Sequence, residues 1–389
     1  MFSKRTDWEL SPNRFTEAHR DLLAQGGEIF DLAISNPTRA GFQYDQRAIV
    51  QALNSPAVLD YNPQPKGLRS ARDAVAAYYR DRREEFDVDP ESLVLTTSTS
   101  EGYSYVFRLL CNPDDEVLVP KPSYPLFEFL ADLQDVKLVP YPLIYDHGWQ
   151  IDFSSLYKAA NHRTRAVVVV HPNNPTGSYV SKDEQRELNS FCRDHKLSLI
   201  VDEVFLDYAI DGAQRQSFAV NCETLTFTLS GLSKICGLPQ MKLSWVVTSG
   251  PSKQVSAAMD RLEVIADTYL SMSAPIQLAA PVLLEQRHSV QPQLLVRVRG
   301  NMVELDRQLS AQKAGERLSL DGGWYAVLRV PALQSDEDLA IGILQKEGVL
   351  LHPGHFYDFP SDGYLVLSLI TPPALFKTGI ERVLGLLNP

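Results

Sequence analysis

Between Leu93 and Thr248 the chain repeats one rhythm: a short run of β-branched residues, then turn residues, then a helical pattern. This alternation is typical of an α/β domain. The most apolar run, Ala166 to Val170, lacks polar alternation, as expected for a parallel strand that is buried on both faces. We therefore predict an α/β fold whose large domain has a seven-stranded, mainly parallel sheet, built from the runs LVLTT, EVLVP, VKLVP, AVVVV, LSLIVDE, LTFTLS and WVVTS.

The pattern changes after about residue 275, where a long helical stretch from 279 to 312 begins. The runs GGWYAVLRVP and GYLVLSLI then flank a second helical pattern near 336–347, which predicts a smaller α+β domain. A chain of 389 residues is long enough for two domains. We predict an N-terminal segment, 1–34, that docks on the small domain, a large domain over 35–278 and a small C-terminal domain over 279–389.

Composition argues against several classes of partner. The net charge of -11 disfavours a nucleic-acid partner, because such binding rests on clustered Lys and Arg. No stretch approaches the apolar length of a membrane span, and no signal peptide begins the chain, so a cytoplasmic protein is expected. The four cysteines are scattered, and the HPGH step with His352 and His355 lacks further ligands, so we expect no metal site.

Hydroxyl side chains gather where the first predicted strand runs into a helix. Ser98, Thr99 and Ser100 follow the run LVLTT at the head of a helical pattern. A helix N-terminus offers free N–H groups and a positive dipole end, which suits a phosphate group. The alternative is that Ser98 and Glu101 form a simple capping box.

Three further polar side chains follow predicted strands. Asn174 lies in HPNNPTG, Asp202 ends LIVDE, and Lys234 follows a strand in SGLSKICG. Ligands of open α/β sheets bind beyond the carboxyl ends of strands, so these side chains are candidates for one site. A buried lysine near a second cation, here Lys242, becomes a good amine nucleophile toward an aldehyde. Each residue also has a plain alternative as a turn, a cap or a surface lysine.

The ordered set, with separations of 28 and 32 residues, resembles the fold-type I enzymes of the aspartate aminotransferase superfamily, which use pyridoxal 5'-phosphate (PLP). The resemblance also covers ISNPT from Ile34, Tyr61, PSYP at Pro122 to Pro125 and PGHF at Pro353 to Phe356. It implies that residues 35–278 form a PLP-binding domain. It also implies a homodimer with shared active sites.

By this resemblance Lys234 forms the Schiff base with the cofactor aldehyde and later carries a proton. Asp202 pairs with the pyridine nitrogen, Asn174 donates to the ring oxygen and Tyr124 stacks on the ring. Tyr61 reaches the phosphate of a partner subunit. The remaining candidates for the phosphate are Ser98, Thr99, Ser100, Ser233 and Lys242.

Three positions depart from the family pattern. Phe205 replaces a tyrosine that donates to the ring oxygen, which predicts a raised pKa for the Schiff base. Lys242 replaces an arginine at the phosphate, and Val366 replaces the arginine that binds the substrate carboxylate. Arg39 and Arg329 are the candidates to take over that carboxylate.

The resemblance favours an aminotransferase that moves an amino group from an amino acid to a 2-oxo acid. The altered positions leave a PLP-dependent lyase, oxidase or cyclising synthase as the alternative. A ligand-sensing domain of a transcription regulator is the third possibility. Only about 35 residues precede ISNPT, which are too few for a DNA-binding domain with a linker.

Overall fold

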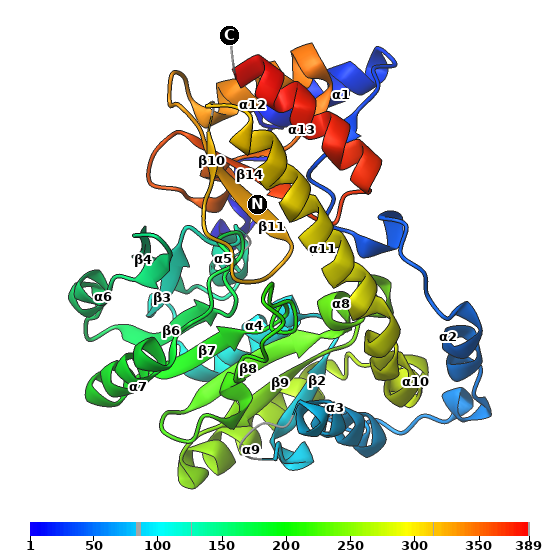
Figure 1. Cartoon of the computed structure of the whole chain (residues 1–389). Coiled ribbons are helices and arrows are strands. Elements are labelled where there is room, and N and C mark those ends of the chain that lie inside the picture. The colour runs from blue at the N-terminus through cyan, green and yellow to red at the C-terminus, as the bar shows by residue number, and fades with distance from the viewer. Residues whose placement is uncertain (83–86, 126, 314, 388–389) are drawn as a thin grey trace.

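The computed structural model describes residues 1–82, 87–125, 127–313 and 315–387. Its largest element is an eight-stranded sheet with strand order β2-β9-β8-β7-β6-β3-β4-β5 (Figure 1). The five central strands from β8 to β4 run parallel, whereas β9 is antiparallel to both of its neighbours and β5 is antiparallel to β4. The strands are β2 (Leu93–Thr96), β3 (Glu116–Lys121), β4 (Lys137–Tyr145), β5 (Trp149–Ile151), β6 (Thr164–Val170), β7 (Ser198–Asp202), β8 (Thr226–Gly231) and β9 (Ser244–Ser249).

Helices cover both faces of this sheet, and each face buries its own apolar cluster. Val168 and Ile200 pack with side chains of α4 and α9, whereas Val169 and Val201 pack with side chains of α7. Neighbouring residues of one strand therefore enter opposite cores, which explains why the run Ala166 to Val170 is apolar without alternation. The helices of this part are α2 (Gln46–Leu53), α3 (Arg69–Asp81), α4 (Thr99–Leu110), α5 (Phe127–Asp132), α6 (Phe153–Ala159), α7 (Lys182–His195), α8 (Leu232–Ile235), α9 (Ser252–Tyr269) and α10 (Ala274–Glu285).

A smaller part stands above the carboxyl ends of the parallel strands (Figure 1). Its four-stranded sheet has the order β10-β11-β14-β13, and all three pairings are antiparallel. The helices α11, α12 and α13 pack on it through buried leucine, isoleucine and valine side chains. The elements are α11 (Arg287–Ser310), β10 (Glu316–Arg317), β11 (Tyr325–Arg329), α12 (Asp336–Glu347), β12 (Val349–Leu350), β13 (His352–Pro353), β14 (Tyr364–Ser368) and α13 (Pro373–Leu387).

The first residues of the chain contact this smaller part. Helix α1 (Arg14–Ala24) begins with Arg14, whose guanidinium forms ion pairs with Glu337 and Asp338 of α12. Strand β1 (Phe30–Asp31) pairs in parallel with β12. The N-terminal segment therefore contacts α12 and β12 of the smaller part. The domain boundaries at residues 34 and 278 remain predictions.

The α/β fold class is confirmed, and all seven predicted runs form strands of the large sheet. The sheet has eight strands because the short strand β5 pairs with the end of β4. Ser181 and Glu184 form the capping box of α7. The stretch 279–312 is divided between two helices at Gln286. Within the described residues, no helix is long and apolar enough to cross a membrane.

Candidate active site

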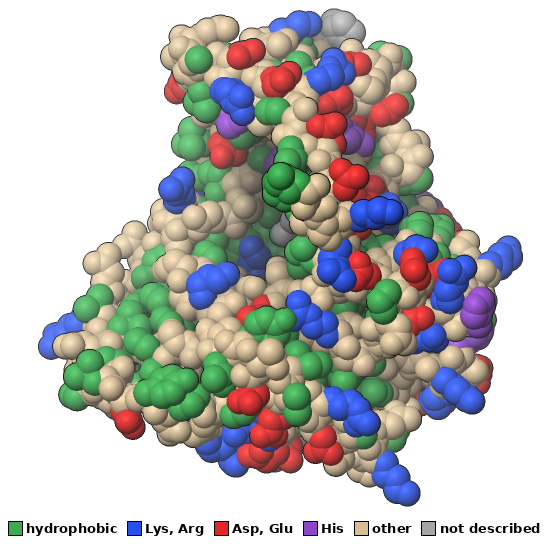
Figure 2. Space-filling model, turned by 180° about the vertical axis from the view of Figure 1, so that it is seen from behind, with side chains coloured by type: hydrophobic (Ala, Val, Ile, Leu, Met, Phe, Trp, Pro, Cys, Tyr) green, Lys and Arg blue, Asp and Glu red, His purple; other side chains and the backbone are tan. Residues whose placement is uncertain are grey.

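A cavity of about 550 Å³ lies at the carboxyl ends of the parallel strands. Figure 2 shows the surface hollowed between the broad lower part and the narrower upper part, with hydrophobic side chains along the recess. The cavity draws its walls from both parts of the chain and from the N-terminal segment. The residues that line it include eight predicted site residues: Ser98, Thr99, Ser100, Tyr124, Asn174, Asp202, Ser233 and Lys234.

Lys234 lies in the one-turn helix α8, directly after β8. Gly231 ends that strand, and a Cβ there would lie 2.9 Å from the carbonyl oxygen of Leu243, so glycine permits the close approach of the two chain segments. The ammonium Nζ lies 5.1 Å from the ring centroid of Trp324 and 5.5 Å from that of Phe205. Burial lowers the pKa of Lys234 to about 8, so about a tenth of this side chain is a neutral amine at pH 7, far more than for an ordinary lysine.

Asp202 is the last residue of β7, and its carboxylate is buried. It accepts hydrogen bonds from the hydroxyl of Tyr103 at 3.3 Å and from the backbone N–H of Val204 at 3.1 Å. Burial raises the pKa of Asp202 to about 6, although these two bonds and the positive charge of Lys234 oppose the rise. The carboxylate is therefore a strong acceptor for a protonated ring nitrogen.

Asn174 follows β6 on the turn that also contains Asn173 and Thr176. Asn173 is held by bonds to the carbonyl of Pro122 and the hydroxyl of Thr176. By contrast, the amide oxygen of Asn174 is buried and has no hydrogen-bond partner within the described residues. A buried polar group of this kind needs a partner, and its position in the cavity wall points to a polar ligand.

The hydroxyl-rich end of the cavity lies at the N-terminus of α4. The hydroxyl of Ser98 accepts a bond from the N–H of Glu101 at 3.2 Å, so the capping alternative holds for this serine. The carboxylate of Glu101 accepts a hydrogen bond from the backbone N–H of Thr97, not from that of Ser98 as a capping box would require. Thr99 and Ser100 occupy the first turn, where backbone N–H groups have no partner within the helix. This end suits a phosphate group.

Sequence reasoning did not assign the residues on the upper side of the cavity. Tyr325, His352 and Tyr357 line it, together with Phe356. Val366 pairs with His352 across β13 and β14 and with Val327 across β14 and β11. Directly opposite residues share a face, so Val366 lies on the same sheet face as His352 and Tyr325. Asn13 and Ser35 add the N-terminal segment to the lining.

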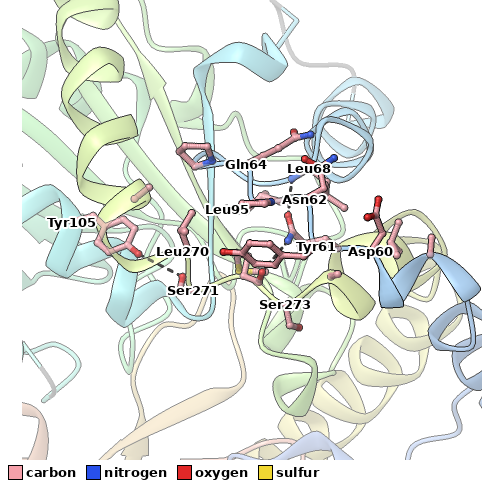
Figure 3. A pocket seen from close by; sticks show the side chains of 18 residues that line it. Asp60, Tyr61, Asn62, Gln64, Leu68, Leu95, Tyr105, Leu270, Ser271 and Ser273 are labelled. Carbon is pink, nitrogen blue, oxygen red and sulfur yellow. Dashed lines mark hydrogen bonds between the residues drawn. The ribbon is translucent and has the colours of Figure 1, made fainter.

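Four predicted site residues lie outside this cavity. Lys242 is exposed at the end of a 3-10 turn, Arg39 is exposed in another, and Arg329 pairs with Glu316 on the outer edge of the upper sheet. Tyr61 is 82% exposed and lines a second cavity with Tyr105, Ser271 and Ser273 (Figure 3). The predicted roles of these four residues remain predictions.

One group of side chains has the spacing of metal ligands within the described residues. Asp81, Glu285 and His288 are exposed on the surface, and the guanidinium of Arg287 bonds to both carboxylates at 2.5 and 2.9 Å. Both carboxylates therefore already share one guanidinium as a hydrogen-bond partner.

The cavity and the fold together define a class of enzyme. The amine of Lys234, with its lowered pKa, can attack an aldehyde. The carboxylate of Asp202 can accept a hydrogen bond from a protonated ring nitrogen, and the N-terminus of α4 can bind a phosphate. Each of these three side-chain environments lies at the carboxyl end of a strand of one sheet. This arrangement is that of an enzyme that uses a phosphorylated pyridine aldehyde.

The chain belongs to the aminotransferase class I and II family, whose model matches residues 28–375. It is 29% identical to the glutamate-pyruvate aminotransferase AlaA of Escherichia coli over 91% of this chain and 89% of the relative. It is 30% identical to the alanine aminotransferase of Mycobacterium tuberculosis over 93% and 86%. A solved aminotransferase from Escherichia coli superposes with a TM-score of 0.88 at 26% identity, covering 100% of this chain and 98% of that one.

The chain is thus a PLP-dependent aminotransferase, as the sequence predicts. The residues present fit the cofactor. Lys234 faces the cavity with a lowered pKa, Asp202 offers its carboxylate, and the orphaned amide of Asn174 lies in the same wall. The cavity, at about 550 Å³, is of the size that small cofactors occupy.

Proposed function

We propose that this enzyme transfers an amino group between small amino acids and 2-oxo acids, with L-glutamate and pyruvate as the first pair to test. The observation that carries the proposal is the convergence of Lys234, Asp202 and Asn174 on one cavity. The two relatives named for glutamate, pyruvate or alanine support this choice of substrates.

Lys234 is proposed to bind the cofactor aldehyde and then to move a proton at the substrate carbon. Its neutral form is accessible because burial holds its pKa at about 8. The rings of Phe205 and Trp324 lie beside the amine, with their centroids 5.5 and 5.1 Å from Nζ. A base with a pKa near the working pH can both accept and return the proton.

Asp202 is proposed to keep the cofactor's ring nitrogen protonated. When bound, PLP supplies a ring that withdraws the electron pair left at the substrate carbon after proton loss. The bonds from Tyr103 and Val204 hold the carboxylate of Asp202 in place for this role. The amide nitrogen of Asn174 is proposed to donate to the ring oxygen. Tyr124 is proposed to cover the ring, and Thr99, Ser100 and Ser233 to bind the phosphate with the first turn of α4.

The chain is also proposed to act as a homodimer. Tyr61 is exposed beside a cavity whose other wall comes from residues 270–274, between α9 and α10 (Figure 3). A tyrosine that protrudes from its own subunit is suited to reach into a second one. Light scattering of the purified enzyme should give twice the mass of one chain; a monomer that retains full activity would contradict this part of the proposal.

The decisive experiment follows both halves of the reaction. L-glutamate should convert the cofactor to its amine form, and pyruvate should restore the aldehyde form with formation of alanine. The Lys234→Ala variant should do neither. Release of ammonia or peroxide without formation of the cofactor's amine form would instead favour a lyase or an oxidase.

A further inference from the structure

An amino acid and a 2-oxo acid both carry a carboxylate beside the reacting carbon, so the cavity needs a donor for that group. Of the described residues that line it, Lys234 is the only lysine or arginine and Asp202 the only carboxylate. Lys234 is already assigned to the cofactor. The substrate carboxylate must therefore find a donor that is neither a guanidinium nor a second ammonium group.

His352 lines the cavity from the upper part of the chain. It shares a sheet face with Val366 and Tyr325, whose positions follow from the register of β13, β14 and β11. The ring is half-buried, and its Nδ1 lies 3.0 Å from the hydroxyl of Tyr357. This is the one imidazole in the cavity lining of the described residues.

The bond between Nδ1 and the hydroxyl of Tyr357 orients the ring of His352, and the tautomer of the imidazole sets which of the two atoms donates. Burial raises the pKa of Tyr357 well above its ordinary value, so the hydroxyl keeps its proton and is able to donate it to Nδ1. In the neutral imidazole an acceptor Nδ1 leaves the proton on Nε2. No bond from Nε2 is recorded among the described residues, so this N–H is available to a ligand.

We propose that the Nε2–H of His352, oriented by the hydroxyl of Tyr357, binds the carboxylate of the amino acid and 2-oxo acid substrates. The inference deepens the proposed function and rests on it, because it takes an amino acid as the donor. His352 is then the residue that distinguishes an amino acid from the amine that lacks its carboxylate. A hydrogen bond to a charged group is of the strength needed for such discrimination.

The test compares the binding of two ligands that differ by one carboxylate. 2-Methylalanine has no hydrogen on the carbon that bears its amine, so it binds to the holoenzyme without transfer; tert-butylamine, which has a methyl group in place of the carboxylate, also lacks that hydrogen. Titration of the cofactor's visible band gives a dissociation constant for each ligand. The ratio of the two constants measures carboxylate recognition without any turnover.

His352→Met removes the donor, whereas His352→Gln keeps an N–H donor at a similar reach. We expect His352→Met to weaken binding of 2-methylalanine by about 10- to 100-fold and to leave the binding of tert-butylamine within about twofold. His352→Gln should recover part of the loss. His355→Met is the matched control, since His355 is exposed three residues away and does not line the cavity.

Several outcomes would overturn the inference. The wild-type enzyme could bind both ligands equally, or His352→Met could weaken both equally, or Arg39→Ala could change the ratio while His352→Met does not. Retained cofactor absorbance and melting temperature show that each variant is folded. If no amino acid reduces the cofactor to its amine form but the ratio still depends on His352, the proposed function fails and the inference stands.

Discussion

Phe205 offers a direct way to add one hydrogen-bond donor to the cavity. Its ring is 3% exposed, lines the cavity and has its centroid 5.5 Å from the Nζ of Lys234. In Phe205→Tyr the new hydroxyl is expected to donate to the cofactor's ring oxygen. That oxygen carries the most negative charge after the neighbouring Schiff-base nitrogen has lost its proton, so the donor favours the deprotonated form.

The size of the effect follows from the strength of such a bond. A hydrogen bond to a charged group contributes about 1.5–3 kcal/mol, and a shift of one pKa unit corresponds to about 1.4 kcal/mol. The pKa of the Schiff base should therefore fall by about one to two units in Phe205→Tyr.

A pH titration of the visible band of the holoenzyme measures this pKa directly. Phe205→Leu is the control, since it removes the ring without adding a hydroxyl and should not lower the pKa. The reasoning is refuted if Phe205→Tyr binds the cofactor with normal stoichiometry and shows the same or a higher pKa than the wild-type enzyme.

Three further predictions concern the cofactor residues. Lys234→Ala should abolish the visible band at neutral pH and lower turnover by more than about a thousandfold; retained activity would contradict the role of this lysine. Burial raises the pKa of Asp202 from 3.8 to about 6, so in the cofactor-free protein its contribution to stability is full below about pH 4 and is lost as the pH rises through 6. Asp202→Asn should remove that pH dependence, worth up to about 3 kcal/mol, from melting curves between pH 4 and 7. Tyr61→Ala should weaken cofactor binding in equilibrium dialysis by about tenfold, the loss of one charge-assisted bond, while the dimer persists; unchanged affinity would place Tyr61 outside the phosphate site.

The large sheet could be predicted because its central strands are buried on both faces. Such strands read as continuous β-branched runs, whereas β5 has three residues of which one is buried and gives no comparable signal. The division at Gln286 was missed for a similar reason. The backbone there stays in the right-handed helical region and the junction has neither glycine nor proline, so the helical pattern continues through it.

Part of the site could be predicted by one rule, since the carboxyl ends of parallel strands meet at one edge of the sheet. That rule brings Asn174, Asp202 and Lys234 together without knowledge of distances. Tyr325 and His352 come from an antiparallel sheet that docks above this edge, and no local pattern reports such docking. The prediction that Arg39 or Arg329 binds the carboxylate rests on charge and on position in the sequence, and neither determines which way a side chain faces, so it remains a prediction.

The pairing of β1 with β12 has a consequence for how the enzyme is made. The cavity takes side chains from Asn13 and Ser35 near one end of the chain and from His352 and Tyr357 near the other. A growing polypeptide can fold the large sheet early, but it cannot close the cavity until residues up to Tyr357 have left the ribosome. Binding of the cofactor in the complete cavity therefore follows folding of the large sheet, and a chain truncated before β13 should fold in part yet hold no complete site.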